Sequence, residues 1–109
     1  MQRPPPTVRL NVELRLTSRE RRAFDALCAA ELRTPGRMAT RIVVRALARR
    51  AASLPAYPIL RGSRSRWSVQ VRLTPAQRRE LGRRAREDGR SLGNLVTVVV
   101  AQELRLTPR

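Results

Sequence analysis

The sequence predicts a mostly α-helical fold with a two-stranded antiparallel ribbon, in the order β-α-α-linker-β-α-α. Three observations predict it. A short sequence motif occurs twice, each copy opens with a strand in which apolar and polar residues alternate, and two helices with capping residues follow each strand. The repeated phrases are VELRLTSRE at 12–20 and VQVRLTPAQ at 69–77. Because both copies carry the same pattern, we expect their strands to pair with each other.

The repeat extends well beyond the opening phrase. Residues 11–47 align with residues 68–104 at a constant offset of 57 positions, without a gap. The identical pairs are Val12/Val69, Arg15/Arg72, Leu16/Leu73, Thr17/Thr74, Arg21/Arg78, Arg22/Arg79, Arg33/Arg90, Gly36/Gly93, Thr40/Thr97, Val43/Val100 and Leu47/Leu104. A unit of ~40 residues is too small to bury a sufficient core alone, and a lone strand leaves backbone groups unpaired. We therefore expect the two copies to form one compact domain, in which the chain acts as its own dimer.

The predicted strands have one buried face and one exposed face. Val12, Leu14 and Leu16 alternate with polar residues in the first copy, and the second copy repeats this alternation. A period of two places apolar residues on one side of a strand and polar residues on the other. The apolar faces should lie on the helices.

Helix starts follow each strand at once. Thr17-x-x-Glu20 and Thr74-x-x-Gln77 both fit a capping box. Gly89 fits the end of the first helix in the second copy, whereas the first copy has Leu32 at that position.

A second, more apolar helix follows in each copy. Thr34 and Ser91 supply the capping hydroxyls. The run 96–100 contains four valines and favours a strand by propensity. We still predict a helix there, because the aligned segment RALARRAA in the first copy favours a helix.

The predicted domain organisation has four parts. Residues 1–8 form a disordered basic arm, 9–50 the first unit, 51–66 a linker and 67–106 the second unit. Tyr57 and Trp67 are expected to pack the linker.

The charge of the chain favours a polyanionic partner. Its 24 basic residues are all arginine, against 8 acidic residues, which gives a net charge of +16. Arginine binds phosphate and guanine edges bidentately, so the expected partner is DNA first, then RNA, then an anionic membrane surface. Only three aromatic residues are present, which argues against single-strand binding by stacking.

Several other classes of function have little support. With no histidine and one cysteine, Cys28, the chain offers no His/Cys zinc site and no internal disulfide. We expect no catalytic residues, no cofactor and no metal. No apolar run approaches the ~20 residues of a membrane span, and MQRPPPTVRL lacks the apolar core of a signal peptide. The expected location is the cytoplasm, in association with the nucleoid.

In its order of elements, the chain resembles the ribbon-helix-helix DNA-binding proteins, of which Arc and the methionine repressor are familiar members. The resemblance covers roughly 9–49 and 66–106, and LTPAQRRELGRRAREDGRSLGNLV at 73–96 is its closest part. It implies a tandem ribbon-helix-helix pseudo-dimer, whose ribbon enters the major groove of DNA. The implied base-reading residues are Asn11, Glu13, Arg15, Ser68, Gln70 and Arg72.

The resemblance also implies phosphate binding at the start of each second helix, where backbone N–H groups favour anions. The implied phosphate-binding residues are Arg9, Thr34, Gly36, Arg37, Ser91, Gly93 and Asn94, with Arg61, Arg64 and Arg66 as further contacts. The two glycines could instead serve only helix packing. Glu13 could pair with Arg72 across the ribbon, and its difference from Gln70 predicts an asymmetric base preference. Other arginines are expected on solvated helix faces: Arg21, Arg22, Arg78, Arg79, Arg83, Arg84 and Arg86.

The predicted function is sequence-specific binding of double-stranded DNA, most simply as a transcriptional repressor, with self-association on adjacent sites. The alternatives are an accessory protein of a plasmid-transfer relaxosome and a sequence-independent factor that packages RNA or DNA. An antitoxin ranks lower, and a membrane-surface helix lowest.

Overall fold

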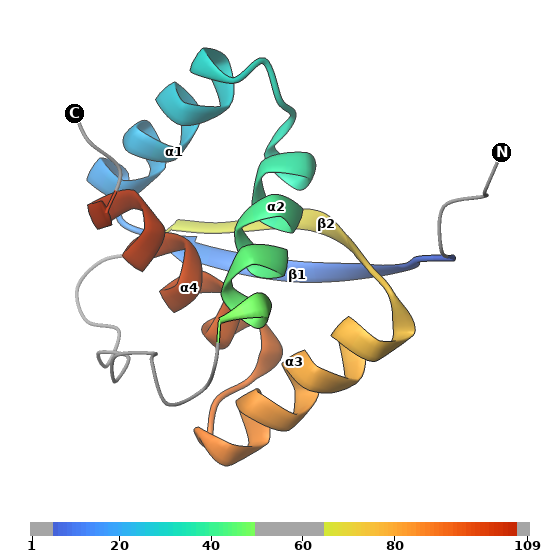
Figure 1. The fold of residues 1–109 in the computed structure, drawn as a ribbon. Coiled ribbons are helices and arrows are strands. Elements are labelled where there is room, and N and C mark those ends of the chain that lie inside the picture. The colour runs from blue at the N-terminus through green and yellow to red at the C-terminus, as the bar shows by residue number, and fades with distance from the viewer. Residues whose placement is uncertain (1–5, 50–64, 107–109) are drawn as a thin grey trace, which may run out of the picture.

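The computed structural model describes residues 6–49 and 65–106. In the described chain, two strands form one antiparallel ribbon and four helices cover one of its faces (Figure 1). The elements are β1 (Val8–Leu16), α1 (Ser18–Ala30), α2 (Pro35–Ala48), β2 (Ser65–Leu73), α3 (Pro75–Glu87) and α4 (Leu92–Leu106).

The predicted fold class is corrected in its linker and its strand bounds. The element order is β-α-α-β-α-α, and β2 begins at Ser65, within the stretch 51–66 that the sequence assigned to a linker. Antiparallel pairing with β1 continues as far as Leu16 and Ser65, which draws the end of that stretch into the ribbon. At the other end, Val8 belongs to β1 rather than to an arm. Tyr57, Arg61 and Arg64 lie outside the described residues.

The strand register makes the two copies symmetric about one point. Val12 pairs with Val69, which is its own counterpart at the offset of 57. The neighbouring pairs therefore mirror each other, and Arg9 lies opposite Arg72 as Arg15 lies opposite Arg66. Below, "counterpart" means the residue 57 positions away.

The second helices cross over between copies. α2 packs mainly on β2, and α4 packs mainly on β1. These two helices also contact each other beneath the ribbon. Since each strand is covered by the second helix of the other copy, the core of either copy is incomplete without its partner.

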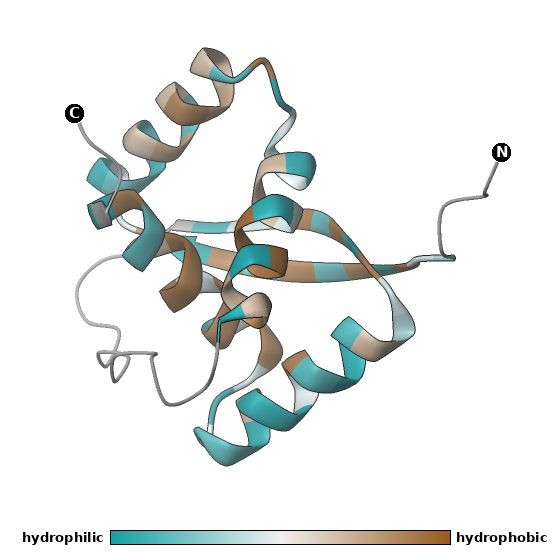
Figure 2. Ribbon diagram, in the orientation of Figure 1, coloured by the Kyte–Doolittle hydropathy of each residue, from teal (hydrophilic) through white to brown (hydrophobic). Residues whose placement is uncertain are grey.

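The core lies between the ribbon and the helices. Hydrophobic positions are frequent on α4 and along the strands, whereas α3 is largely hydrophilic (Figure 2). Leu14, Val71 and Leu73 are fully buried under the strands. Val96 and Val100 are fully buried on α4. The predicted helix over the valine run is confirmed, since α4 spans Leu92–Leu106. Burial on nearly every side of α4 outweighs the strand propensity of its β-branched residues.

Both predicted capping boxes are confirmed. The backbone N–H of Glu20 donates to Thr17 Oγ1 at 3.1 Å, and the backbone N–H of Thr17 donates to Glu20 Oε1 at 2.9 Å. Thr74 and Gln77 repeat this exchange at the start of α3.

Trp67 lies in β2 and packs against the core, whereas linker residues 51–64, against which it was predicted to pack, lie outside the described residues. Its ring meets Phe24 edge to face, with ring centroids 5.2 Å apart. The guanidinium of Arg21 lies over the same ring at 4.0 Å from the centroid. Because β2 begins before Trp67, the strand alternation turns this side chain toward the helices.

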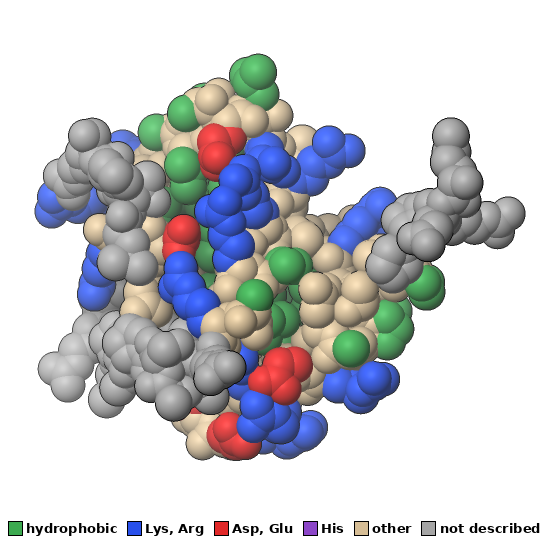
Figure 3. All heavy atoms as spheres, viewed as in Figure 1, with side chains coloured by type: hydrophobic (Ala, Val, Ile, Leu, Met, Phe, Trp, Pro, Cys, Tyr) green, Lys and Arg blue, Asp and Glu red, His purple; other side chains and the backbone are tan. Residues whose placement is uncertain are grey.

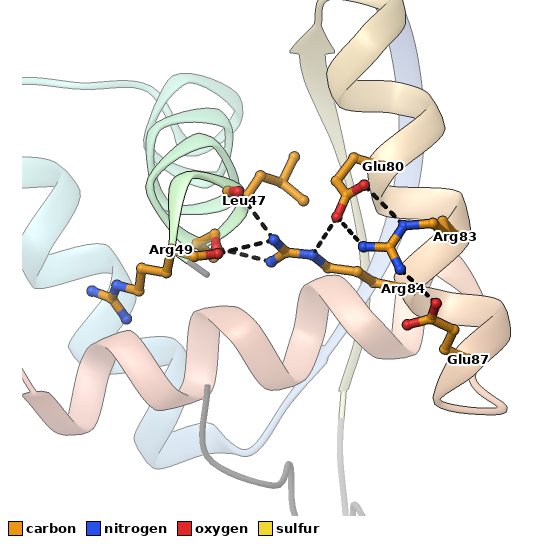
Figure 4. A network of polar contacts seen from close by, with 7 residues as sticks. Leu47, Arg49, Glu80, Arg83, Arg84 and Glu87 are labelled. Carbon is orange, nitrogen blue, oxygen red and sulfur yellow. Dashed lines mark hydrogen bonds and ion pairs between the residues drawn. The ribbon is translucent and has the colours of Figure 1, made fainter. Parts of the chain in front are cut away.

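Arg84 also departs from its prediction as a solvated residue. Its side chain is 14% exposed and lies at the C-terminal end of α2 (Figure 4). It donates to the carbonyl oxygens of Ala46, Leu47 and Arg49 at 3.0–3.1 Å, and to Glu80 Oε1 at 2.9 Å. The last carbonyl groups of a helix have no hydrogen-bond donor within the helix, and the guanidinium of Arg84 provides the missing donors.

Candidate nucleic-acid interface

The polar side of the ribbon is turned away from the helices. We call this surface the ribbon face; its residues are Arg9, Asn11, Glu13, Arg15, Arg66, Ser68, Gln70 and Arg72. All of them are exposed or half-buried, whereas most residues that alternate with them are buried. The helices lie on the viewer's side of the ribbon in Figure 1, so the ribbon face points to the back.

The register fixes which side chains are neighbours on the ribbon face. Asn11 lies opposite Gln70, and Glu13 lies opposite Ser68. The structure therefore brings all six predicted base-reading residues onto one continuous surface. Arg66 joins them, although the sequence assigned it to the linker.

Glu13 pairs with two arginines at one end of the ribbon face. Its Oε1 lies 3.4 Å from Arg15 Nε and 3.5 Å from Arg66 Nε. Both distances exceed the range of an ordinary hydrogen bond, and Oε1 is shielded from solvent without a hydrogen bond, so the attraction is that of an ion pair. The predicted pairing of Glu13 with Arg72 is wrong, because the register places Arg72 opposite Arg9.

The chemistry of the ribbon face suits the edges of base pairs. Arginine can bind guanine O6 and N7 bidentately, and glutamine or asparagine can bind adenine N6 and N7. A carboxylate can accept a hydrogen bond from cytosine N4. The ribbon face carries all three kinds of group.

A helix start flanks the ribbon on each side. Thr34 Oγ1 accepts from the backbone N–H of Arg37 at 3.3 Å at the start of α2. Ser91 Oγ accepts from the backbone N–H of Asn94 at 3.1 Å at the start of α4. Both predicted phosphate-binding segments therefore lie beside the ribbon, at its two opposite edges.

Gly36 and Gly93 allow these helix starts to touch the strands. A Cβ at Gly36 would lie 2.7 Å from the carbonyl oxygen of Gln70, and a Cβ at Gly93 would lie 2.9 Å from that of Glu13. Real Cβ atoms essentially never come so close to backbone. The two glycines therefore serve the packing of each helix start on the ribbon, and their role in phosphate binding stays a prediction.

One threonine joins each helix start to the ribbon, and sequence reasoning assigned neither of them a role. Thr40 Oγ1 donates to the carbonyl oxygen of Gly36 at 2.8 Å and accepts from the backbone N–H of Arg72 at 3.1 Å. Thr97 does the same for Gly93 and Arg15, with the same distances. Each hydroxyl accepts a hydrogen bond from a backbone N–H group at the edge of a strand. It thereby holds the backbone of one base-reading candidate next to the start of a helix. The signal was present in the identical pair Thr40/Thr97, inside an otherwise apolar stripe.

A groove of about 560 Å³ runs along the exposed side of α2 beside the edge of β2. We call it the α2 groove. Its basic residues are Arg33, Arg37, Arg41, Arg45 and Arg72, and Gln70 and Thr34 also line it. The groove therefore connects two base-reading candidates with the start of α2. Figure 3 shows the side of the molecule that the helices cover, which is opposite to the ribbon face. Arginine side chains lie near α2 on that side, with acidic side chains between them.

The network around Glu80 lies away from the ribbon face. Hydrogen bonds from Arg83 and then Arg84 lower the pKa of Glu80 from 4.5 to about 2, and the same contact raises the pKa of Arg83. Burial, and then the charge of Asp25, raises the pKa of the Cys28 thiol. This keeps the thiol protonated and unreactive, in agreement with its predicted burial.

In comparisons with known proteins, the chain matches no family model, no curated protein and no solved structure. Within the described residues, no helix combines the length and the apolar character needed to cross a bilayer.

Proposed function

We propose that the chain binds double-stranded DNA in a sequence-specific way through its ribbon face, and acts as a transcriptional repressor on the nucleoid. The observation that carries the proposal is the ribbon face itself. It presents arginine, glutamine, asparagine and carboxylate groups on a rigid two-stranded ribbon, with a helix start at each edge. The resemblance to the ribbon-helix-helix proteins belongs to the same proposal.

The size of the ribbon supports the major groove as its place of binding. Two paired strands lie ~4.8 Å apart, and the major groove is ~12 Å wide, which admits a two-stranded ribbon with its side chains. The ribbon face does not contribute to the core, because the apolar side chains of both strands are on the opposite face, under the helices. Its side chains therefore lie on the side where base edges would be met, each good bidentate pair giving ~1–3 kcal/mol of discrimination.

Charge supplies the sequence-independent part of binding. The net charge of +16 attracts the polyanion, and phosphate contacts position a protein without reading sequence. A repressor needs both parts, because the positioned ribbon then selects its site among competing ones.

The test is selection from a pool of random-sequence duplexes at ~150 mM salt, where sequence-blind binding is weakened. The wild type is compared with Gln70→Ala/Arg72→Ala, which removes two reading side chains but keeps the backbone bond from Arg72 to Thr40. Arg79→Ala is the matched control, since it removes one charge from an exposed position on α3. We expect the wild type and the control to enrich one motif of a few base pairs, and the double variant to lose it while it stays folded.

Two outcomes would contradict the proposal. If no motif is enriched by any of the three proteins, the charge acts as a general clamp and packaging becomes the better account. If RNA competes as well as duplex DNA for the wild type, the partner is RNA.

A further inference from the structure

The two edges of the ribbon differ in charge, although the backbone at the two edges is nearly the same. The α2 groove has five arginines among its lining residues and no carboxylate. The counterparts of the same positions carry two arginines, Arg15 and Arg90, and one carboxylate, Glu13. The α2 groove therefore carries five positive charges, whereas the counterpart positions carry a net charge of +1.

Three of the four charges by which the two edges differ come from substitutions along one face of the second helix, and the fourth comes from Gln70, whose counterpart is Glu13. Arg37, Arg41 and Arg45 are spaced by four residues, so they lie on one side of α2. Their counterparts on α4 are Asn94, Val98 and Gln102. Val98 is only 1% exposed, so α4 offers no polar side chain to solvent at the central position.

The arginines of the α2 groove remain available to a ligand. Arg41 pairs with Glu31 at 3.0 Å and Arg45 with Glu103 at 4.0 Å. Such partly exposed pairs are weak and exchange readily for a phosphate. In the described part of the chain, no carboxylate forms an ion pair with Arg33, Arg37 or Arg72.

The ribbon face is polarised in the same direction. At the α2 end, Arg9 and Arg72 lie opposite each other beside the neutral Gln70. At the α4 end, Arg15 and Arg66 share the carboxylate of Glu13. That carboxylate would face a phosphate with the wrong sign and already neutralises part of the arginine charge there.

We propose that the α2 groove holds the phosphate backbone of one DNA strand by its arginine side chains, while the α4 edge does not, so that the chain lies on duplex DNA in a single orientation. This proposal rests on the proposed DNA-binding function. It adds that phosphate contacts are concentrated at one end of the ribbon, and that the arginine line of α2, ~12 Å long from residue 37 to 45, makes them.

The experiment measures the affinity for one fixed duplex of ~25 base pairs as a function of salt concentration. The groove variant is Arg37→Asn/Arg45→Gln, which installs the residues that α4 already carries at the same positions. The charge-matched control is Arg79→Asn/Arg86→Gln, at exposed positions of α3. A second comparison uses one counterpart pair, Arg33→Gln against Arg90→Gln. Far-ultraviolet circular dichroism and the fluorescence of Trp67, the single tryptophan, check that each variant is folded.

Each lost phosphate contact should reduce the slope of log affinity against log salt by ~0.9. We expect the groove variant to lose ~1.8 from the slope, Arg33→Gln to lose ~0.9, and both the control and Arg90→Gln to leave it nearly unchanged. Equal losses in the groove variant and the α3 control, or in Arg33→Gln and Arg90→Gln, would overturn the one-sided clamp while DNA binding itself stands. If the folded wild type does not bind the duplex at all, the proposed function fails, and the clamp fails with it.

Discussion

α2 contacts α3, and α1 contacts α4. These two corners occupy equivalent places in the two copies but differ in chemistry. At the α2–α3 corner, Arg84 donates to three carbonyl oxygens at the end of α2 and to Glu80. At the α1–α4 corner, the counterparts are Leu27 and Ala23, and Leu27 packs against the core. A hollow of about 370 Å³ lies beside Ala23, between α1 and α4.

The comparison separates what a repeat must keep from what it may change. The capping boxes, Gly36/Gly93 and Thr40/Thr97 are kept, because they set the backbone positions of helices and ribbon. The corners and the grooves differ, because side chains there can change without moving the backbone. Agreement between the copies therefore marks the positions that set the backbone, together with the candidate base-reading pair Arg15/Arg72, and divergence marks positions where side chains can change.

The largest expected effect comes from filling the contact between helix starts and ribbon. Gly36→Ala and Gly93→Ala should each destabilise the protein by ~1–3 kcal/mol, since overpacking against backbone is not easily relieved. Gly36 should be the more sensitive, with its closer approach of 2.7 Å. Urea unfolding followed by circular dichroism measures the free energy.

Gly82→Ala is the control for that prediction. A Cβ there would meet only the flexible end of Arg78, at 3.3 Å, so the gain in helix propensity of up to ~1 kcal/mol should prevail. Equal losses at all three glycines would show that the close contacts do not determine the outcome.

The next effect compares the two corners. Arg84→Met should cost ~2 kcal/mol, because it leaves carbonyl oxygens at the end of α2 without their charged donor. Leu27→Met, at the counterpart position, should cost less than ~1.5 kcal/mol, since volume-conserving apolar exchanges are tolerated. Chemical denaturation of both variants tests this, and a larger loss for Leu27→Met would contradict it.

A smaller effect concerns the turns after the first helices. Leu32 has a φ of 52° and is 93% exposed, whereas its counterpart Gly89 has a φ of 64°. The left-handed region costs an L-residue roughly 1–2 kcal/mol. Leu32→Gly should raise stability by ~1 kcal/mol, and Gly89→Leu should lower it by a similar amount. A thermal melt that shows Leu32→Gly less stable than the wild type would refute this account of the turn.

The smallest effect is a dependence on pH at the α2–α3 corner. The pKa of Glu80 is lowered from 4.5 to about 2, so its stabilising contribution is complete above pH ~5 and is lost as pH falls toward 2. The difference in melting temperature between the wild type and Glu80→Gln should shrink over that range. Because the pair is partly exposed, added salt should shrink it as well. A difference that stays constant from pH 5 to 2 would argue against this origin.

Sequence alone was sufficient for the parts of the fold with local signals. The capping boxes and the alternation along the strands follow from patterns of a few residues, whereas the helix over the valine run followed from its alignment with the first copy. The end of α1 was harder, because only the second copy carries a glycine there and Leu32 adopts the same turn against its propensity.

The parts that failed depend on register and on contacts between distant segments. Glu13 has Arg66 rather than Arg72 as its partner, because the ribbon extends to Ser65. The role of Arg84 required knowing that α3 meets the end of α2. The one-sided charge of the α2 groove was present in the alignment, but only the structure shows that Arg37, Arg41 and Arg45 line one groove with Arg72.

The central claim is that the ribbon face reads DNA and that its two ends have diverged. The most direct test repeats the selection from random duplexes with Glu13→Gln, after which position 13 carries the same residue as its counterpart Gln70. Only Asn11 and Ser68 would then differ between the counterpart pairs of the ribbon face. The account predicts an asymmetric motif for the wild type and a motif closer to an inverted repeat for the variant. An identical motif for both proteins would contradict it.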